Sequence, residues 1–147
     1  MRHTKLHRRA VFALTLAGAL GLYTACATMS GLASAQQITL SGSNEVPPVS
    51  TPATGTGTVT INPDRSVSAK ITVSGMTATA SHIHEGAAGT NGPVIVPFTK
   101  SADNTFVAPD GAKLTEAQYA SFKAGNLYVN VHSAQYPGGE VRAQLKP

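Results

Sequence analysis

The stretch TGTVTINPDRSVSAKITV, residues 56–73, decides the fold class. Its two halves are rich in β-branched residues and alternate in part between apolar and polar positions, which is typical of half-buried strands. Between them, Asn62-Pro63-Asp64-Arg65 combines a proline that presets a turn φ with side chains that can bond nearby backbone N–H groups. The stretch is therefore predicted to form a β-hairpin.

The rest of the chain continues this pattern. Gly and Pro clusters separate five further expected strands, which are Ile38–Ser41, Ala78–His84, Val94–Phe98, Leu127–His132 and Val141–Leu145. Short strands with regular turns predict an antiparallel, Greek-key-like β-sandwich. One short helix is expected after Leu114, because Thr115 and Gln118 have the spacing of a capping box and Gly125 suits the position after the helix. The expected fold class is all-β with one short helix.

The first 35 residues are expected to be a signal peptide. Four basic residues open the chain, a charge-free apolar stretch spans residues 10–22, and Ala33-Ser34-Ala35 has the small-x-small pattern of a cleavage site. A retained membrane anchor is the less favoured alternative. The mature part, residues 36–147, is therefore expected to be one domain that does not span a membrane and lies outside the cytoplasm, in the periplasm or secreted.

Two variants of export stay open. Arg8-Arg9 followed by apolar residues would suit a twin-arginine signal as well as the general secretory route. Cys26 is a less favoured candidate for lipid attachment, because Tyr23 stands three positions before it, where lipoprotein signals usually have Leu.

Charge and cysteine content exclude several classes of function. The leader holds four of the 11 basic residues and none of the seven acidic ones, so the mature part has seven of each and no net charge. Nothing basic is left to attract a phosphate backbone, and nucleic-acid binding is not expected. Without Cys26, the mature part has neither a disulfide nor a thiolate metal site.

The histidines of the mature part, His82, His84 and His132, are its strongest chemical signal. Residues two apart on a strand point to the same face, so His82 and His84 are expected side by side, with Ile83 facing the core. His132 is expected on the polar face of its own strand. Two ligands from one strand and a third from a neighbouring strand form a common metal-binding geometry.

The type of ligand narrows the choice of metal. Imidazoles without thiolates favour copper, with zinc second, and the absence of an Asp-rich loop argues against calcium. Three ligands leave an open position, and the candidates for a further ligand or a supporting role are Glu85, Glu140, Met76, Asn130 and Tyr136. The alternative interpretation is that the histidines are structural and bond a carbonyl group or water.

Three other charged positions are expected to be structural. Glu45 precedes Pro47-Pro48 and is expected to follow an edge strand and to pair with a nearby cation, rather than to enter the polar site. Glu140 and Arg142 are expected to form a surface ion pair of small energetic value.

Several ordered motifs resemble the CHRD (chordin-type) domain family. They are Leu40–Pro48, Ser81–Gly86, Asn91–Val94, Val129–Ser133 and Tyr136–Arg142, so the resemblance covers nearly all of Gln37–Lys146. It implies a single-domain exported member with an extracytoplasmic β-sandwich. The His-x-His-Glu stretch and Arg142 are also similar to copper-zinc superoxide dismutase, another β-sandwich, but that copper site uses more histidines than the three present here.

These observations leave three hypotheses. The leading one is an exported domain that binds, buffers or delivers a metal ion, with copper preferred and zinc as the alternative. The second is an adhesion or protein-interaction module with structural histidines. The third is a copper-dependent redox enzyme of the superoxide-dismutase type, and an enzyme is the less favoured outcome, with no catalytic residue assigned. A homodimer through an exposed edge of the sandwich is a further candidate.

Overall fold

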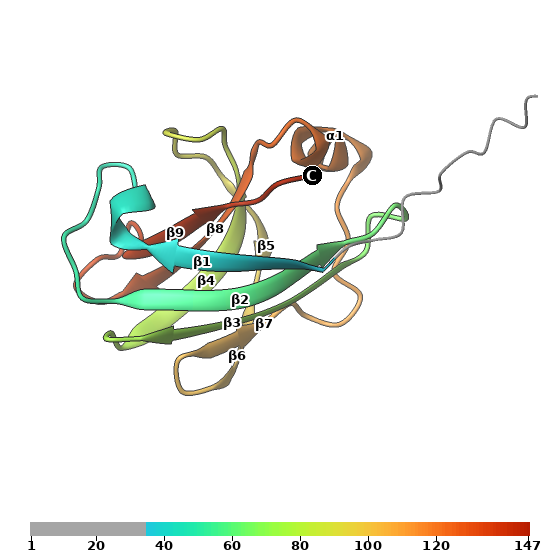
Figure 1. Ribbon diagram of the computed structural model, residues 1–147. Helices are drawn as coiled ribbons and strands as arrows, with labels where there is room; N and C mark the ends of the chain where they lie inside the picture. Colours follow the sequence, from blue (N-terminus) through green and yellow to red (C-terminus); the bar gives the residue numbers. More distant parts are fainter. Residues whose placement is uncertain (1–34) are drawn as a thin grey trace, which may run out of the picture. The chain divides into compact units, whose positions relative to one another are not determined.

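The computed structural model of the chain describes residues 35–147 (Figure 1). The predicted leader, with Cys26 and all but the last residue of the expected cleavage motif, lies outside the described residues. Within the described part, nine strands make one antiparallel sheet in the order β5-β4-β8-β9-β1-β2-β3-β7-β6. Their bounds are β1 Gln36–Ser41, β2 Thr54–Ile61, β3 Val67–Ser74, β4 Ala78–Glu85, β5 Val94–Pro97, β6 Thr99–Ala102, β7 Thr105–Val107, β8 Leu127–Ser133 and β9 Val141–Gln144.

The predicted hairpin is confirmed as β2 and β3, which pair from Ile61 opposite Val67 to Thr54 opposite Ser74. The turn is closed by the backbone N–H of Asn62, which donates to the carbonyl of Ser66 at 3.0 Å. The Asp64 carboxylate accepts from the Ser66 N–H at 3.0 Å. As the sequence indicated, a turn side chain therefore bonds the nearby backbone.

One continuous segment joins the two ends of the sheet. β5 and β6 stand at opposite ends of the strand order, yet only Phe98 separates them in the sequence. The N–H of Phe98 donates to the carbonyl of Ser81 on β4 at 3.0 Å, while β6 pairs with β7. The sheet therefore curls into a nearly closed two-layered sandwich, and the all-β prediction is confirmed. The edge-to-edge dimer stays a prediction.

The core lies between the two layers. Its fully buried side chains come from strands of both, among them Leu40, Val59, Ile71, Ile83, Val129 and Val131, each 0 % exposed. These are the inward positions of alternating strands, so the apolar periodicity of the sequence marks the core correctly.

The single helix of the described part is α1 (Glu116–Lys123). Its N-terminus has the predicted capping box, in which Thr115 and Gln118 bond each other's backbone N–H groups. Gly125 follows the helix with a positive φ of 76°, where a side chain would be strained. The hydroxyl of Ser121 donates to the Glu85 carboxylate at 2.5 Å, which fixes the helix to the end of β4.

The sequence did not predict the β6–β7 hairpin. All four residues of β6 are exposed, so it has no apolar alternation. Its turn depends on Asn104, which has a positive φ of 55°. The Asn104 side chain accepts from the Ala78 N–H at 3.0 Å and donates to the Met76 carbonyl at 2.9 Å. These long-range bonds position the hairpin.

No helix among residues 35–147 combines the length and apolar character needed to cross a bilayer.

Candidate metal centre

Strands β4, β8 and β9 present a second buried face on the side opposite the core. Their registers align His82 with Asn130 and Arg142 in one row, and His84 with Tyr128 and Gln144 in the next. Since alternate residues point to opposite faces, all six point away from the core. All seven residues of β8 are buried, so this strand is covered on both faces. We refer to this second face as the polar layer.

Three loops cover the polar layer, namely residues 43–49, 86–93 and 134–140. Arg142 holds the second loop, because its Nη2 donates to the carbonyl oxygens of Ala87 and Thr90 at 3.3 and 2.9 Å. The first loop is tied to the second where the Asn91 amide donates to the Val46 carbonyl at 2.7 Å. The sequence predicted which residues would point outward, but not that loops would bury them.

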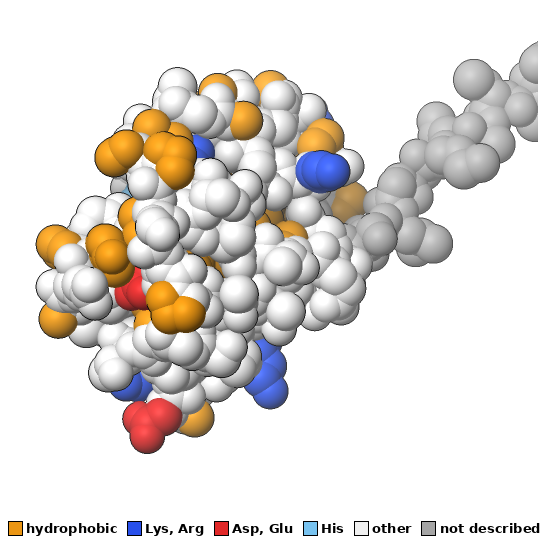
Figure 2. Space-filling model, turned by 60° about the vertical axis from the view of Figure 1, so that its left-hand side comes forward, with side chains coloured by type: hydrophobic (Ala, Val, Ile, Leu, Met, Phe, Trp, Pro, Cys, Tyr) orange, Lys and Arg blue, Asp and Glu red, His pale blue; other side chains and the backbone are white. Residues whose placement is uncertain are grey.

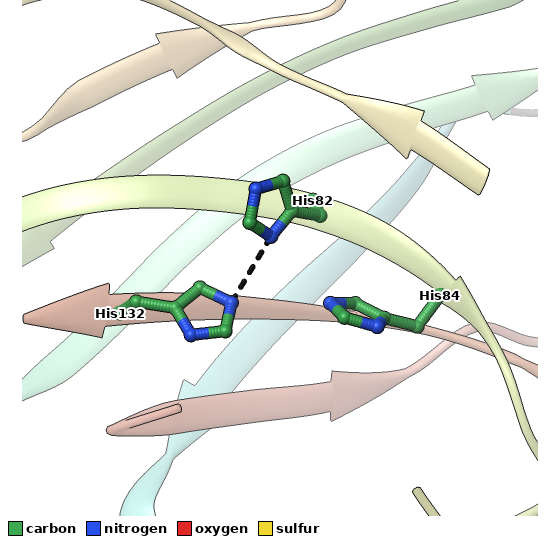
Figure 3. A group of neighbouring side chains, drawn as sticks. All are labelled: His82, His84 and His132. Carbon is green, nitrogen blue, oxygen red and sulfur yellow. Dashed lines mark hydrogen bonds between the residues drawn. The ribbon is translucent and has the colours of Figure 1, made fainter. Parts of the chain in front are cut away.

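The three histidines meet in this layer (Figure 3). Because β4 pairs directly with β8, His132 lies opposite Ala80 and diagonal to His82. Nδ1 of His82 is 3.0 Å from Nε2 of His132. One nitrogen of each of His82, His84 and His132 lies within 4.8 Å of the other two. Such a group could hold a metal ion.

Backbone carbonyls fix the orientation of two of the imidazoles. Nδ1 of His84 donates to the Gly92 carbonyl and Nδ1 of His132 donates to the Pro137 carbonyl, each at 2.9 Å. Both rings therefore keep a lone pair on Nε2. Metal-binding histidines commonly have such a partner on the other nitrogen, because it sets the tautomer and the ring orientation. Nε2 of His84 is buried and has no hydrogen-bond partner.

The three imidazoles are uncharged at neutral pH. Burial is the largest cause that lowers the pKa of His82, and with the charges of His132 and His84 it brings that pKa to about 4. Burial also lowers the pKa of His84 and of His132, although their backbone hydrogen bonds act in the opposite direction. Neutral imidazole is the form that binds a metal, so no proton has to leave these rings first.

A stack of three side chains supports His84. Its ring lies 4.8 Å from the Tyr128 ring at an interplanar angle of 7°, and the Arg142 guanidinium lies 3.4 Å from the Tyr128 centroid. The Tyr128 hydroxyl accepts from the Gly92 N–H at 3.1 Å. A side chain at Gly92 would collide with the Glu85 carbonyl, so only glycine fits there. Tyr128 was not among the expected site residues, although its alternation with Asn130 and His132 marks the same face.

Glu45 enters the polar layer, contrary to the sequence-based expectation. It is 4 % exposed, and the one ion pair among residues 35–147 is Lys100–Asp103. The expectation was wrong because β1 is a central strand between β9 and β2, so the chain that follows it crosses the sheet face. Burial raises the pKa of Glu45 to about 7, against the lowering effects of Arg142 and of hydrogen bonds from Asn130 and Val46.

The expected surface pair of Glu140 and Arg142 is also wrong. Arg142 is 1 % exposed, because the loops cover its face. Glu140 instead accepts from the Thr51 hydroxyl at 2.7 Å. Among the candidates for a further ligand, Glu85 bonds Ser121 at the end of β4.

The other three candidates lie in different surroundings. Met76 lines a hollow together with Glu140 and packs partly against the core. Tyr136 belongs to the loop whose Pro137 carbonyl orients His132, and its side chain is half-buried. Asn130 lies in the row of His82, and its Oδ1 is buried without a hydrogen-bond partner.

Two hollows open beside the segment that carries Glu45, with volumes of about 520 and 400 Å³. Glu45 and Val46 line both, while Ala88 belongs to the larger and Tyr136 and Pro137 to the smaller. Figure 2 brings this side of the molecule forward and shows hydrophobic side chains gathered around a recessed acidic one.

The comparisons with known proteins agree with the motifs in the chain. The family model described as the CHRD domain matches residues 36–145, which is nearly all of the described part. No curated protein and no solved structure matches the chain.

Proposed function

Because the chain belongs to the CHRD domain family, whose domains are extracellular modules, we propose that it is an exported protein that binds one transition-metal ion through His82, His84 and His132. Its role would be to hold, buffer or deliver that ion outside the cytoplasm. The predicted leader supports export, in the periplasm or beyond it.

One observation carries the proposal. Two of the three imidazoles are oriented by backbone carbonyls so that Nε2 keeps its lone pair, and Nε2 of His84 is buried without a partner. A histidine that only supports the fold would be expected to pair both ring nitrogens or expose one to water. An ion between His84, His132 and His82 would pair this atom.

Copper is the preferred ion and zinc the second. Imidazole ligands without a thiolate suit copper and zinc, and an all-imidazole site outside the cytoplasm favours Cu(II). The described residues also contain no cysteine to provide a thiolate.

The test is a titration of the 36–147 fragment, which contains the complete sheet and core, with Cu(II) and with Zn(II). About one ion per chain is expected, and a His82→Ala/His84→Ala variant should lose it. Asp103→Asn, at an exposed residue outside the polar layer, is the matched control and should bind like the parent. A parent fragment that binds neither ion would leave the histidines structural.

The second candidate is an extracytoplasmic interaction module. The two hollows and the apolar side chains around Val46 and Tyr136 favour it, since such surfaces mark binding sites. In that case a His84→Ala variant would keep the binding of its protein partner, and metal would not affect it. Redox activity would be a third role, and metal-loaded protein no more active than the free ion would exclude it.

A further inference from the structure

A line of buried polar side chains leads from the three-histidine cluster to Glu45. His84 on β4, Asn130 on β8 and Glu45 after β1 are 7 %, 2 % and 4 % exposed. Each has one polar atom without a hydrogen-bond partner, namely Nε2 of His84, Oδ1 of Asn130 and Oε1 of Glu45. Since buried polar atoms are normally paired, three such atoms in one layer indicate that an ion or a proton completes them.

Asn130 lies between the other two residues. Its side-chain amide is a polar neighbour of the Glu45 carboxyl group on one side and of the His84 imidazole on the other. Nδ2 of Asn130 and Oε1 of Glu45 both stand 2.5 Å from the place where a side chain on Gly139 would begin. Glycine at position 139 therefore leaves room for the amide and the carboxyl group to approach each other.

We propose that Asn130 couples the two ends of this line, so that a divalent ion bound at His84 and a proton on Glu45 exclude each other. The inference rests on the proposed function, because it requires an ion at His84. On binding, the Glu45 carboxyl group loses its proton to the solvent and becomes a carboxylate, and the reverse change accompanies release of the ion.

The coupling follows from the two ways in which the Asn130 amide can be turned. With its NH₂ group towards Glu45, the amide donates to a carboxylate, and its oxygen faces His84 and the positive ion. After a half-turn, its NH₂ group donates to the free Nε2 of His84, and its oxygen accepts from a protonated Glu45. Each of these two arrangements pairs all the facing atoms. An amide turned one way at Glu45 while His84 is in the state that suits the other turn would set two donors or two acceptors against each other.

The charges around Glu45 agree with this arrangement. Arg142 on β9 is the nearby cation that favours the carboxylate, and burial opposes it. Glu45 faces the uncharged Asn130 of β8, and His84 of β4 lies beyond Asn130. Among the described residues that line its two hollows, Tyr136 is the one titratable side chain besides Glu45 and Arg142. Glu140 of the 134–140 loop is not one of these lining residues and accepts from the Thr51 hydroxyl. No second carboxylate among these lining residues competes for the proton.

The test measures the protons released when Zn(II) binds to the 36–147 fragment. Calorimetry at about pH 7 in two buffers of different ionisation enthalpy gives that number. Because the pKa of Glu45 is about 7, the parent should release about half a proton more per ion than Glu45→Gln. Between about pH 8 and pH 6, its affinity should fall about tenfold more than that of the variant.

Two further variants sharpen the test. Glu116→Gln makes the same chemical change on the exposed side of α1 and should release as many protons as the parent. Asn130→Ala interrupts the line, and its proton count should fall towards that of Glu45→Gln. Infrared spectra of the parent fragment offer a readout without any variant, since the absorption of a protonated carboxyl group present at about pH 6 should disappear when Zn(II) binds.

The outcomes separate this inference from the proposed function. Zn(II) binding with equal proton counts and equal pH dependence in the parent and Glu45→Gln would overturn the coupling and leave metal binding intact. A protonated carboxyl signal that persists in the Zn(II)-bound parent would also overturn it. A parent that binds no ion even at about pH 8 would remove the proposed function and the coupling together.

Discussion

Replacing Arg142 with lysine tests whether this side chain holds the loops over the polar layer. Its Nη1 donates to the Asn91 side chain at 3.2 Å, and its Nη2 donates to Ala87, Thr90 and Gln144 at 2.9 to 3.3 Å. Its guanidinium also stacks on Tyr128. A lysine ammonium is a compact charge without the planar fork, so it can replace only part of this set.

The expected loss of stability can be worked from these contacts. If lysine keeps two of the four hydrogen bonds, two charge-assisted bonds are lost at about 1.5 kcal/mol each. A lysine ammonium keeps part of the cation–π attraction, so about 1 of the roughly 2 kcal/mol of a buried cation–π pair is lost as well. We therefore expect Arg142→Lys to lower the free energy of unfolding by about 4 kcal/mol, which a domain stable by about 5–15 kcal/mol can survive while still folding.

The assay is urea unfolding of the metal-free 36–147 fragment, followed by circular dichroism. Arg65→Lys is the matched control, because it makes the same change in the β2–β3 turn and should alter stability by less than about 0.5 kcal/mol. Amide hydrogen exchange should also become faster over residues 87–92 in Arg142→Lys alone. A loss below about 1 kcal/mol, with unchanged exchange in that loop, would refute the idea that Arg142 holds it closed.

Three more predictions follow from the same contacts. Ile83→Ala should destabilise the fragment by about 2–5 kcal/mol in urea unfolding, because it removes a core side chain that is 0 % exposed; a smaller loss would contradict the assigned core face. Tyr128→Phe removes the acceptor of the Gly92 N–H and should weaken metal binding about tenfold in a titration, whereas Tyr119→Phe on α1 should not. The pKa of His82 is lowered from 6.5 to about 4, so an unfolded chain takes up that proton first, and the metal-free protein should lose stability as the pH falls from about 6.5 to 4. The pKa of Glu45 is raised from 4.5 to about 7, so this group has the opposite effect and stabilises the fold as the pH falls from about 7 to 4.5. The unfolding should therefore be measured in Glu45→Gln, which removes the opposing effect. A stability of this variant that does not depend on pH would contradict the burial of His82.

Local patterns in the sequence predicted what local physics determines. The β2–β3 hairpin follows from alternation and turn residues, and the start of α1 follows from the spacing of Thr115 and Gln118. The inward direction of Ile83 follows from strand geometry alone. The β6–β7 hairpin was missed because its residues are polar and its turn depends on distant partners of Asn104.

The surroundings of the candidate site depend on sheet order, which alternation does not reveal. Glu45 was expected beside an edge strand, but the neighbours of β1 are β9 and β2. That order directs the following loop across the polar layer and buries the carboxyl group. Arg142 was expected at the surface for the same reason: its position on β9 indicates a face, but not the loops that cover that face.

The segments that resemble the CHRD family contribute to the core, and their buried polar residues meet in the polar layer. Leu40–Pro48 brings Glu45, Ser81–Gly86 brings the histidine pair, and Tyr136–Arg142 brings the carbonyl that orients His132 together with the arginine that holds a loop. Core packing requires only apolar side chains of suitable volume, which many sequences supply. These motifs instead place particular polar residues from distant points of the chain around buried polar atoms that have no partner. A ligand of the polar layer explains this better than the fold alone.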